Sequence, residues 1–389
     1  MDTIRLKRNI KLLRLLELVG HAWPMGAVIA IFFHSITNDY STAALLLGIH
    51  MLVNSFTEIP TGIISDRWTR KQTLMVGYVL MFLWMCAFAW ACFDGGFVAL
   101  LAGVILWGLS DSFISGTDDA ILMETLKDLK SEKTFSKEYS IIKMCRHIGL
   151  GFAMLLAMPV LYFWDMEALV LVCVAVRVPG LFIVAQLTNP NKRETGDVNP
   201  WRHFKSAVSD FTKTKALRRA AFMQIINKGH METLWRIAPM WCALFLPLYL
   251  INFVAIIMRV MISISFALAS KWGRKGIARM GFLSHLYQAI IIFVSVIINS
   301  VVSPFLFFAS YIFAGGSRSA EATAINDNLS DTHRATMNSF ISIFAGIVSA
   351  VMLYLCGIAA DKFGFATVFY VLCAMQLFMA FYWKFVIRR

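Results

Sequence analysis

Ionisable side chains occur inside long apolar segments of this 389-residue chain, where burying a charge in lipid is costly. By default such residues are candidates for binding a polar solute or a proton. They are Glu17, His21, Glu58, Asp111, Asp118, Asp119, Arg146, His147, Arg177, Glu232, Arg236, Arg259, Arg318 and Glu321. A guanidinium group can bind carboxylate or phosphate bidentately, and an imidazole can exchange a proton near neutral pH.

Several of these residues are spaced so that they share one face of a helix. The groups are Glu17 with His21; Lys228, Glu232 and Arg236; and Asp111, Ser115 and Asp118. In the second group, Glu232 can pair in either direction along the helix. For Glu58, Asp119 and Arg177, which lie nearer to segment ends, a structural ion pair is the favoured interpretation. For any one of the others, structural pairing and solute binding both stay open.

The elements that position these residues are predicted to be membrane-spanning helices. Hydrophobic residues make up 59% of the chain and charged residues 15%, whereas a soluble domain has about 25% charged residues. A run of about twenty apolar residues spans a bilayer, and in lipid such runs must be helical. We therefore predict an all-α membrane protein with twelve spans in two pseudo-symmetric six-helix bundles. The spans are 14–36, 41–65, 72–93, 97–124, 139–163, 166–188, 218–246, 248–270, 277–299, 303–325, 335–359 and 363–386.

The basic residues predict the orientation of the chain. Lys and Arg gather in the N-terminal tail, in the even-numbered loops and in the C-terminal tail, while the odd-numbered loops contain only Lys362. Because cytoplasmic loops carry the excess of Lys and Arg, both termini are predicted to be cytoplasmic. The same distribution accounts for the net charge of +13, so nucleic acid is not an expected partner.

The two halves of the chain repeat each other. The clearest pair of motifs is Glu17-x3-His21-x2-Pro24-Met25 and Glu232-x3-Arg236-x2-Pro239-Met240. Two further pairs follow in the same order, the basic loops after the second and eighth spans and the Gly-x3-Ala motifs that begin at Gly116 and Gly316. We therefore expect bundles at 1–188 and 218–389, joined by a cytoplasmic linker at 189–217. Duplicated halves are typical of transporters.

At Gly62-x3-Asp66-Arg67-x2-Arg70-Lys71, between the second and third spans, the chain resembles the major facilitator superfamily. The resemblance extends over the whole chain and implies that spans one, four, seven and ten line a central cavity. It also implies gating roles: Asp66, Arg67 and Arg70 would latch the bundles together on the cytoplasmic side, and Gly62 would allow close helix approach.

Two residues depart from the family pattern in these loops. Thr69 stands where the family usually has glycine, and Ser270 stands where the second copy of the motif would have aspartate. The segments 58–62 and 115–120 resemble a bacterial branch of the superfamily with mostly unassigned substrates. The resemblance therefore implies a multi-pass protein of the bacterial inner membrane.

These observations predict a secondary active transporter that moves a small polar organic solute, anionic or zwitterionic, by alternating access. The candidate substrate-binding residues are Glu17, His21, Asp111, Asp118, Arg146, Glu232, Arg236, Arg259, Arg318 and Glu321. Protons are the candidate coupling ion, through His21, Glu17 or Glu232. The expected partners are the solute, protons and membrane lipids, and the expected state is a monomer.

Two other kinds of function stay open. A drug or toxic-compound efflux antiporter has the same fold, but the basic residues of the spans and the missing Gly-Pro motif of the fifth span speak against it. A non-transporting sensor or a lipid-handling enzyme would need a signalling domain or a catalytic constellation, and we identify neither. No phosphate-binding loop or metal-binding motif is found, so we expect neither a cofactor nor a metal.

Overall fold

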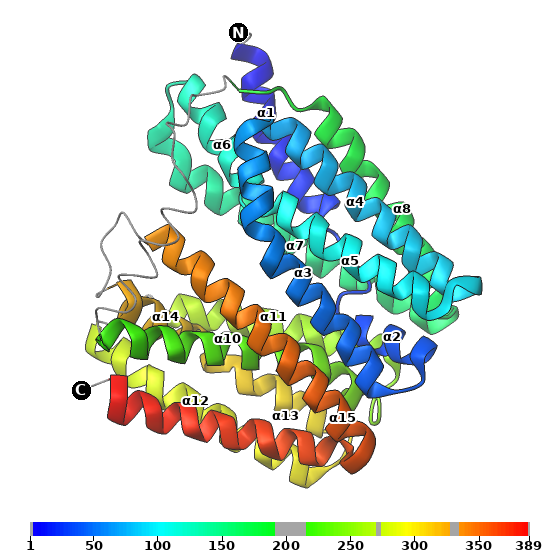
Figure 1. Ribbon diagram of the computed structural model, residues 1–389, viewed down its shortest axis with the longest axis vertical. Helices are drawn as coiled ribbons and strands as arrows, with labels where there is room; N and C mark the ends of the chain where they lie inside the picture. The colour runs from blue at the N-terminus through cyan, green and yellow to red at the C-terminus, as the bar shows by residue number, and fades with distance from the viewer. Residues whose placement is uncertain (1–2, 191–214, 270–273, 327–333, 388–389) are drawn as a thin grey trace. The chain divides into compact units, whose positions relative to one another are not determined.

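The computed structural model describes residues 3–190, 215–269, 274–326 and 334–387. Every regular element in these ranges is a helix (Figure 1). Most of the predicted linker at 189–217, and Ser270 in the second copy of the loop motif, lie outside the described residues. For Asp66 the helix backbone is described, but the side chain is not.

Seven helical stretches of the described chain are long and apolar enough to cross a membrane. Two of them, Arg70–Asp128 with 59 residues and Phe340–Phe385 with 46 residues, are longer than one crossing requires. The chain therefore has the helices of a multi-pass membrane protein. Those helices fall into two compact units, Met1–Thr37 with Ile49–Asp197, and Asn38–Gly48 with Val198–Arg389.

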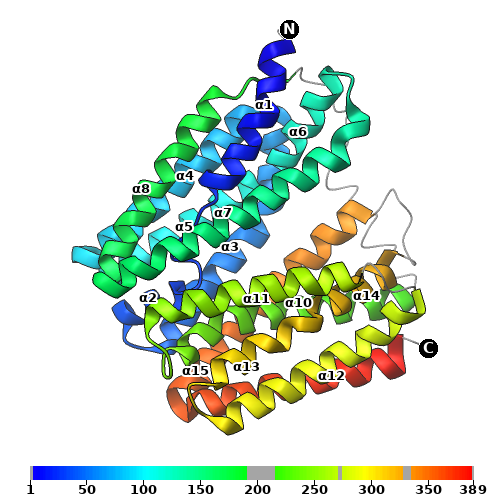
Figure 2. The ribbon, with the colours of Figure 1, turned by 180° about the vertical axis from the view of Figure 1, so that it is seen from behind.

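The first unit consists of helices from the N-terminal half. They are α1 (Thr3–Leu15), the π-helical turn η1 (Leu16–Gly20), α2 (Ile29–Thr37), α3 (Tyr40–Arg67), α4 (Arg70–Trp90), η2 (Ala91–Gly95), α5 (Gly96–Ile114), α6 (Thr117–Asp128), η3 (Glu132–Thr134), α7 (Phe135–Phe163) and α8 (Met166–Gln186). Helix α4 packs along α5 and α8, and η1 packs against α7 and α8 (Figure 2).

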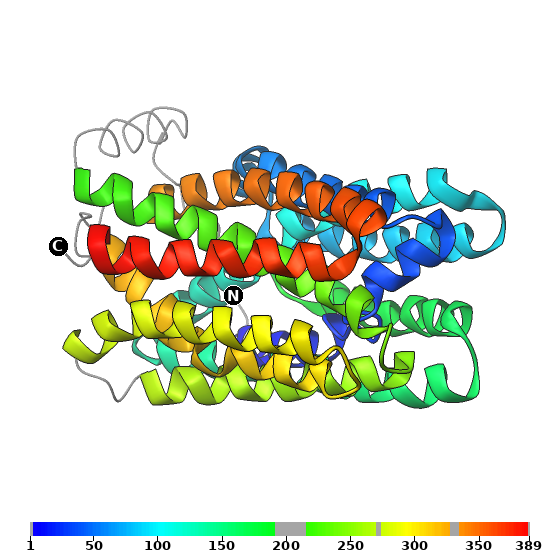
Figure 3. The same ribbon diagram turned by 90° about the horizontal axis from the view of Figure 1, so that it is seen from below.

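The second unit consists of helices from the C-terminal half. They are α10 (Lys215–Cys242), α11 (Leu248–Ala269), α12 (Arg274–Ile298), α13 (Ser303–Ala309), η4 (Ser310–Phe313), α14 (Ala314–Asn326), α15 (Arg334–Tyr382) and η6 (Trp383–Ile387). Helix α15, drawn in orange to red, packs along α10 and α12 (Figure 3). It consists of two helical parts, because the backbone of Gly364 is non-helical.

The first turns of α3 belong to the second unit. There the carboxylate of Asp361 accepts hydrogen bonds from the backbone N–H groups of Tyr40 and Ser41, each 2.8 Å long. These are among the donors that the start of a helix leaves without an intrahelical partner. A carboxylate at this position also interacts favourably with the helix dipole.

The first predicted span is not one continuous helix. The chain leaves the π-helical turn at Gly20, is non-helical from 21 to 28, and resumes as α2 at Ile29. Pro24 has no N–H to donate to a helix. The Arg177 guanidinium donates a 3.0 Å hydrogen bond to the Gly20 carbonyl at the break, which satisfies a backbone group that lipid could not.

The repeated motif of the C-terminal half has a different backbone. Helix α10 continues through Pro239 and ends three residues later, at Cys242. The fourth predicted span also breaks, between α5 and α6, where Gly116 has φ +74, a conformation that favours glycine. Its sequence counterparts Gly315 and Gly316 lie inside α14. The two halves therefore share a motif pattern but not the position of their helix breaks.

Candidate functional site

A buried acid–base cluster surrounds Glu17 in the first unit. Glu17 is only 1% exposed, and its carboxylate oxygens lie 3.3 Å from His21 Nδ1, 3.9 Å from Lys143 Nζ and 3.8 Å from Arg146 Nε. The last two residues are on α7, one turn apart and therefore on one face. The sequence-predicted pair of Glu17 and His21 is thus brought together with Arg146.

A glycine on α7 allows this approach. A Cβ atom at Gly149 would come within 2.7 Å of the backbone carbonyl carbon of Leu18 in η1, closer than real Cβ contacts allow. The π-helical turn can therefore lie directly against α7, with Glu17 beside the basic side chains one and two turns earlier. Single π turns of this kind occur often at functional sites.

Lys143 links the cluster to the first turn of α6. Its ammonium lies 3.1 Å from Asp118 Oδ2 and 2.7 Å from Asp119 Oδ1. Lys143 is not among the candidate residues from the sequence, and the structure places it inside α7 with 24% of its side chain exposed. Its position three residues before Arg146 is the sequence signal that could have found it.

His21 also connects the cluster to α4. Its Nδ1 atom lies 3.0 Å from the Tyr78 hydroxyl, and both side chains are buried. The helix break therefore has a network of polar side chains from α4, α7 and α8 around it. Non-helical backbone at membrane depth is tolerated where it is buried in protein in this way or lines a water-filled cavity.

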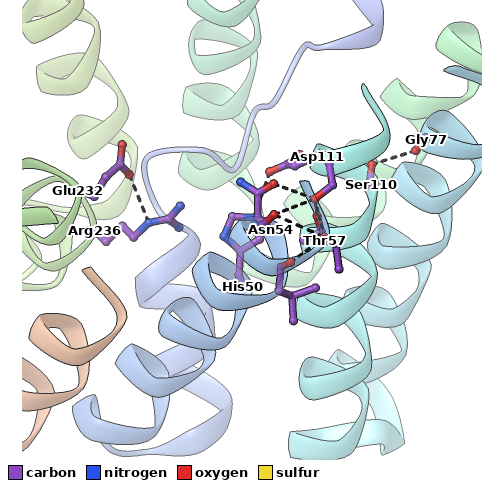
Figure 4. Close-up of polar contacts among 11 residues, drawn as sticks. His50, Asn54, Thr57, Gly77, Ser110, Asp111, Glu232 and Arg236 are labelled. Carbon is purple, nitrogen blue, oxygen red and sulfur yellow. Dashed lines mark hydrogen bonds and ion pairs between the residues drawn. The ribbon is translucent and has the colours of Figure 1, made fainter. Parts of the chain in front are cut away.

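Asp111 forms a separate pair on α5. Its Oδ2 atom lies 3.0 Å from His50 Nε2 (Figure 4). The His50 ring stacks on Trp107 with 3.7 Å between ring centroids. His50 is buried, whereas 38% of the Asp111 side chain is exposed. The sequence analysis did not identify His50. The predicted grouping of Asp111 with Asp118 is not seen as a contact, because Asp118 pairs with Lys143 instead.

The candidate residues of the second unit lie in different surroundings. Arg236 Nε is 3.7 Å from Glu232 Oε2 one helical turn away (Figure 4), and 40% of the Glu232 side chain is exposed. The Arg259 guanidinium lies over the Trp235 ring, 5.2 Å from its centroid, and Arg318 is exposed on α14. Lys228, predicted to join the Glu232 stripe, donates a hydrogen bond to Ser342 on α15.

Glu321 is the candidate that is most completely buried in the second unit. Only 4% of the residue is exposed. Its Oε1 atom accepts a 2.6 Å hydrogen bond from Asn227 Nδ2 and lies 3.5 Å from His285 Nε2. Neither partner was among the residues singled out from the sequence.

The gating candidates lie at the end of α3 and the start of α4. Arg67 is exposed. A Cβ atom at Gly62 would meet nothing within 4 Å, so no close packing inside the first unit depends on this glycine. Thr69 fits the turn without glycine, because it caps α4 through a reciprocal pair of hydrogen bonds with Gln72.

Arg70 makes its observed contacts within the first unit. Its Nε donates a 2.9 Å hydrogen bond to Glu124 Oε1 on α6, and its Nη1 donates to the Ser65 hydroxyl at 2.8 Å. Arg70 thus joins α3, α4 and α6. This contact set gives Arg70 a structural role in addition to the predicted gating role.

We expect Arg70→Ala to lower the unfolding free energy by about 1 kcal/mol, because the pair with Glu124 is only partly buried. A double-mutant cycle with Glu124→Gln, followed by thermal unfolding of purified protein, measures the pair directly. Additive effects of the two substitutions would show that the pair does not contribute to stability.

Among the residues that the structure describes, no group of three His, Cys, Asp or Glu side chains is arranged to hold a metal ion.

A comparison with protein-family models finds one family. The sequence model described as Major Facilitator Superfamily matches residues 15–305. No curated protein matches the chain in sequence. The structure is similar to the nucleoside transporter NupG, with TM-score 0.78, 12% identity and coverage of 97% of this chain and 98% of that one.

Two further solved structures have the same fold. A bacterial homolog of the human lysosomal transporter Spinster, in an inward-facing and unoccupied conformation, has TM-score 0.78 and 12% identity, covering 100% of this chain and 98% of that one. A POT family transporter in complex with 5-aminolevulinic acid has TM-score 0.71 and 11% identity, covering 96% and 95%. At these identities the similarity shows the fold alone.

Proposed function

The chain belongs to the major facilitator superfamily, and we propose that it is a secondary active transporter of a small polar organic solute, anionic or zwitterionic, working by alternating access. It is a multi-pass membrane protein of a transporter family. Beyond membership of this family, we propose the class of solute, the residues that bind it and proton coupling.

We propose the twelve-span arrangement for the whole chain, with six-helix bundles at 1–188 and 218–389 and a cytoplasmic linker at 189–217. The division of the helices into two compact units supports the two bundles. The bacterial inner membrane and a monomeric state belong to the same proposal. The gating assignment of Gly62, Asp66, Arg67 and Arg70 stays a prediction.

The observation that carries the proposed function is the position of Arg146. Its side chain is 39% exposed, and the nearest carboxylate oxygen is 3.8 Å from its Nε. Within the described part of the chain, no residue forms a hydrogen bond with its guanidinium. A charge inside a span faces water or solute rather than lipid, so this guanidinium is available to bind a carboxylate or phosphate.

Half-exposed carboxylates supply the complementary charge for a zwitterion. Asp111 and Glu232 are 38% and 40% exposed, each with a base at one side. In the first unit we propose that Asp111 binds an amine or hydroxyl of the solute and Arg146 its acidic group. In the second unit we propose the same roles for Glu232 and Arg236. The POT transporter solved with 5-aminolevulinic acid, an amino acid, supports the idea that this fold can hold such a molecule.

The other candidate substrate-binding residues differ in how deeply they are buried. His21 and Asp118 are buried beside Glu17. We propose that they position Glu17 and Arg146 and that they exchange a proton with Glu17. Arg259 and Arg318 are proposed as further cationic contacts for an acidic group.

A thermal-shift screen of the purified chain against metabolites tests the proposal, because a bound ligand raises the unfolding temperature in proportion to its occupancy. We expect stabilisation by small carboxylates, phosphates or amino acids. Stabilisation by lipophilic cations alone would favour the drug-efflux alternative instead.

We expect a reporter fused to the C-terminus to read as cytoplasmic, because the Lys and Arg residues gather in the even-numbered loops and tails. A fusion in the loop between the fifth and sixth spans, at 164–165, should read as external. The same signal from both fusions would contradict the proposed topology.

A further inference from the structure

A second polar network lies inside the C-terminal unit, and it includes one substrate-binding candidate from the sequence, Glu321. It consists of side chains from four helices, each at most 7% exposed. They are Asn227 and Met231 on α10, His285 and Gln288 on α12, Glu321 on α14 and Gln376 on α15. Burying so many polar groups is costly unless they are hydrogen-bonded to one another.

The thioether of Met231 determines how the network is oriented. Sulfur in methionine can only accept a hydrogen bond, and the amide nitrogens of Gln288 and Gln376 point toward it at 3.5 and 4.0 Å. The Gln376 amide nitrogen also donates a 2.7 Å hydrogen bond to Gln288 Oε1. The amide oxygen of Gln376 must therefore face the other way, toward His285.

This orientation determines the position of one imidazole proton. His285 Nδ1 lies 2.8 Å from Gln376 Oε1, and since that oxygen can only accept, Nδ1 must carry the hydrogen. In a neutral ring the other nitrogen, Nε2, then has a lone pair and no hydrogen. That nitrogen faces Glu321 Oε1 at 3.5 Å and has no hydrogen-bond partner in the described chain.

A neutral His285 therefore leaves two acceptors facing each other. Glu321 Oε1 accepts the 2.6 Å hydrogen bond from Asn227 and keeps a second lone pair, so one additional proton can be shared between Oε1 and His285 Nε2. With that proton the pair becomes an imidazolium and a carboxylate, and both ring nitrogens gain a partner. Without it the Glu321 carboxylate has no cation in direct contact among the described residues, which is costly for a buried charge.

Two further ionisable groups of the described chain act on this pair. Arg318, on the same helix as Glu321, and His230, on α10, are within electrostatic reach. Helix α15 presents the neutral Gln376. Helix α11 meets α14 at Ser265 and Phe266, neither of which titrates.

We propose that His285 and Glu321 form a proton-binding site that takes up one proton and supplies the coupling proton of transport. The part of this inference that concerns coupling rests on the proposed transport function, whereas proton binding by the pair does not. The site is distinct from His21, Glu17 and Glu232, which the sequence favoured for this role.

The proton itself is the first probe. We would record ¹⁵N NMR of the histidine-labelled full chain in lipid nanodiscs from about pH 9 to about pH 5, the range in which imidazoles exchange protons. His285, identified by the signals missing from His285→Gln, should gain its second ring proton in the wild type. In Glu321→Gln this step should be lost, because no carboxylate compensates the charged ring.

Glu167→Gln, at an exposed carboxyl in the first turn of α8, is the matched control and should leave the His285 step intact. Should Glu321→Gln not fold, Gln376→Leu tests the same network, because loss of the acceptor at Nδ1 should change the His285 titration. A His285 ring with one proton over the whole range, or an unchanged step in the folded variant, would overturn the proposal.

The second probe is a radiolabelled hit from the thermal-shift screen, in proteoliposomes. His285→Gln should retain exchange of this compound but lose the stimulation of its uptake by an imposed pH gradient. Stimulation equal to that of the wild type would refute the coupling role. Since Arg146 is intact in this variant, retained binding with lost stimulation separates failure of coupling from failure of the proposed function.

Discussion

Arg146→Ala should weaken binding of an acidic solute about 10- to 100-fold, which corresponds to the roughly 1.5–3 kcal/mol typical of a hydrogen bond to a charged group. The reason is that the guanidinium is half exposed and only distantly paired with Glu17. Its donors are therefore free to bind the solute before the substitution and are lost after it. Calorimetry with the compound identified by thermal shift measures the effect.

Two matched variants make this result specific. Arg146→Lys should recover only part of the affinity, because an ammonium cannot replace a bidentate contact. Arg218→Ala removes an exposed arginine in the first turn of α10 and should leave the affinity unchanged. Equal affinity in the wild type and in Arg146→Ala would make Arg146 a structural partner of Glu17 and remove the main support for an acidic solute.

The helical, membrane-spanning class of the protein could be predicted from the sequence because it depends on composition and run length alone. The family could be predicted because Asp66 and its basic neighbours fall at a characteristic spacing in one loop, and the family match confirms it. Neither inference depends on which side chains are in contact in the folded protein.

The helix breaks could not be predicted from the repeated motif. Pro24 and Pro239 occupy equivalent positions, yet only the first lies in a non-helical segment. The difference lies in the surroundings, since Arg177 on α8 satisfies the carbonyl of Gly20 at the break. A proline shows where a helix can open, but tertiary partners decide whether it does.

Only some of the residues in the polar clusters could be predicted from the sequence. Glu17, His21 and Arg146 stood out because they are charged residues within apolar runs. His50 and His285 lie in equally apolar surroundings, but their roles depend on partners from helices distant in sequence. Lys143 was missed because positive charges near a span end were assigned to topology, and that assignment does not distinguish a loop lysine from one on the inner face of a helix.

Lys143 is also the residue whose removal should have the largest effect on stability. Three carboxylates lie within 3.9 Å of its ammonium, those of Glu17, Asp118 and Asp119. Two of them are buried, and breaking a buried ion pair by removing one partner typically costs about 3–5 kcal/mol. Because Lys143 and Asp119 are partly exposed, we expect Lys143→Met to lower the free energy of unfolding by about 3 kcal/mol, the lower end of this range.

The loss should come from uncompensated charge rather than from packing, and the controls separate the two. Lys143→Arg keeps the charge and should retain most of the stability, while adding Asp119→Asn to Lys143→Met should recover part of it. Lys137→Met, at an exposed position on the same helix, should change the unfolding temperature little. Thermal unfolding of the four variants tests this prediction. If Lys143→Met is as stable as Lys137→Met, the Lys143 ammonium does not stabilise the carboxylates of Glu17, Asp118 and Asp119.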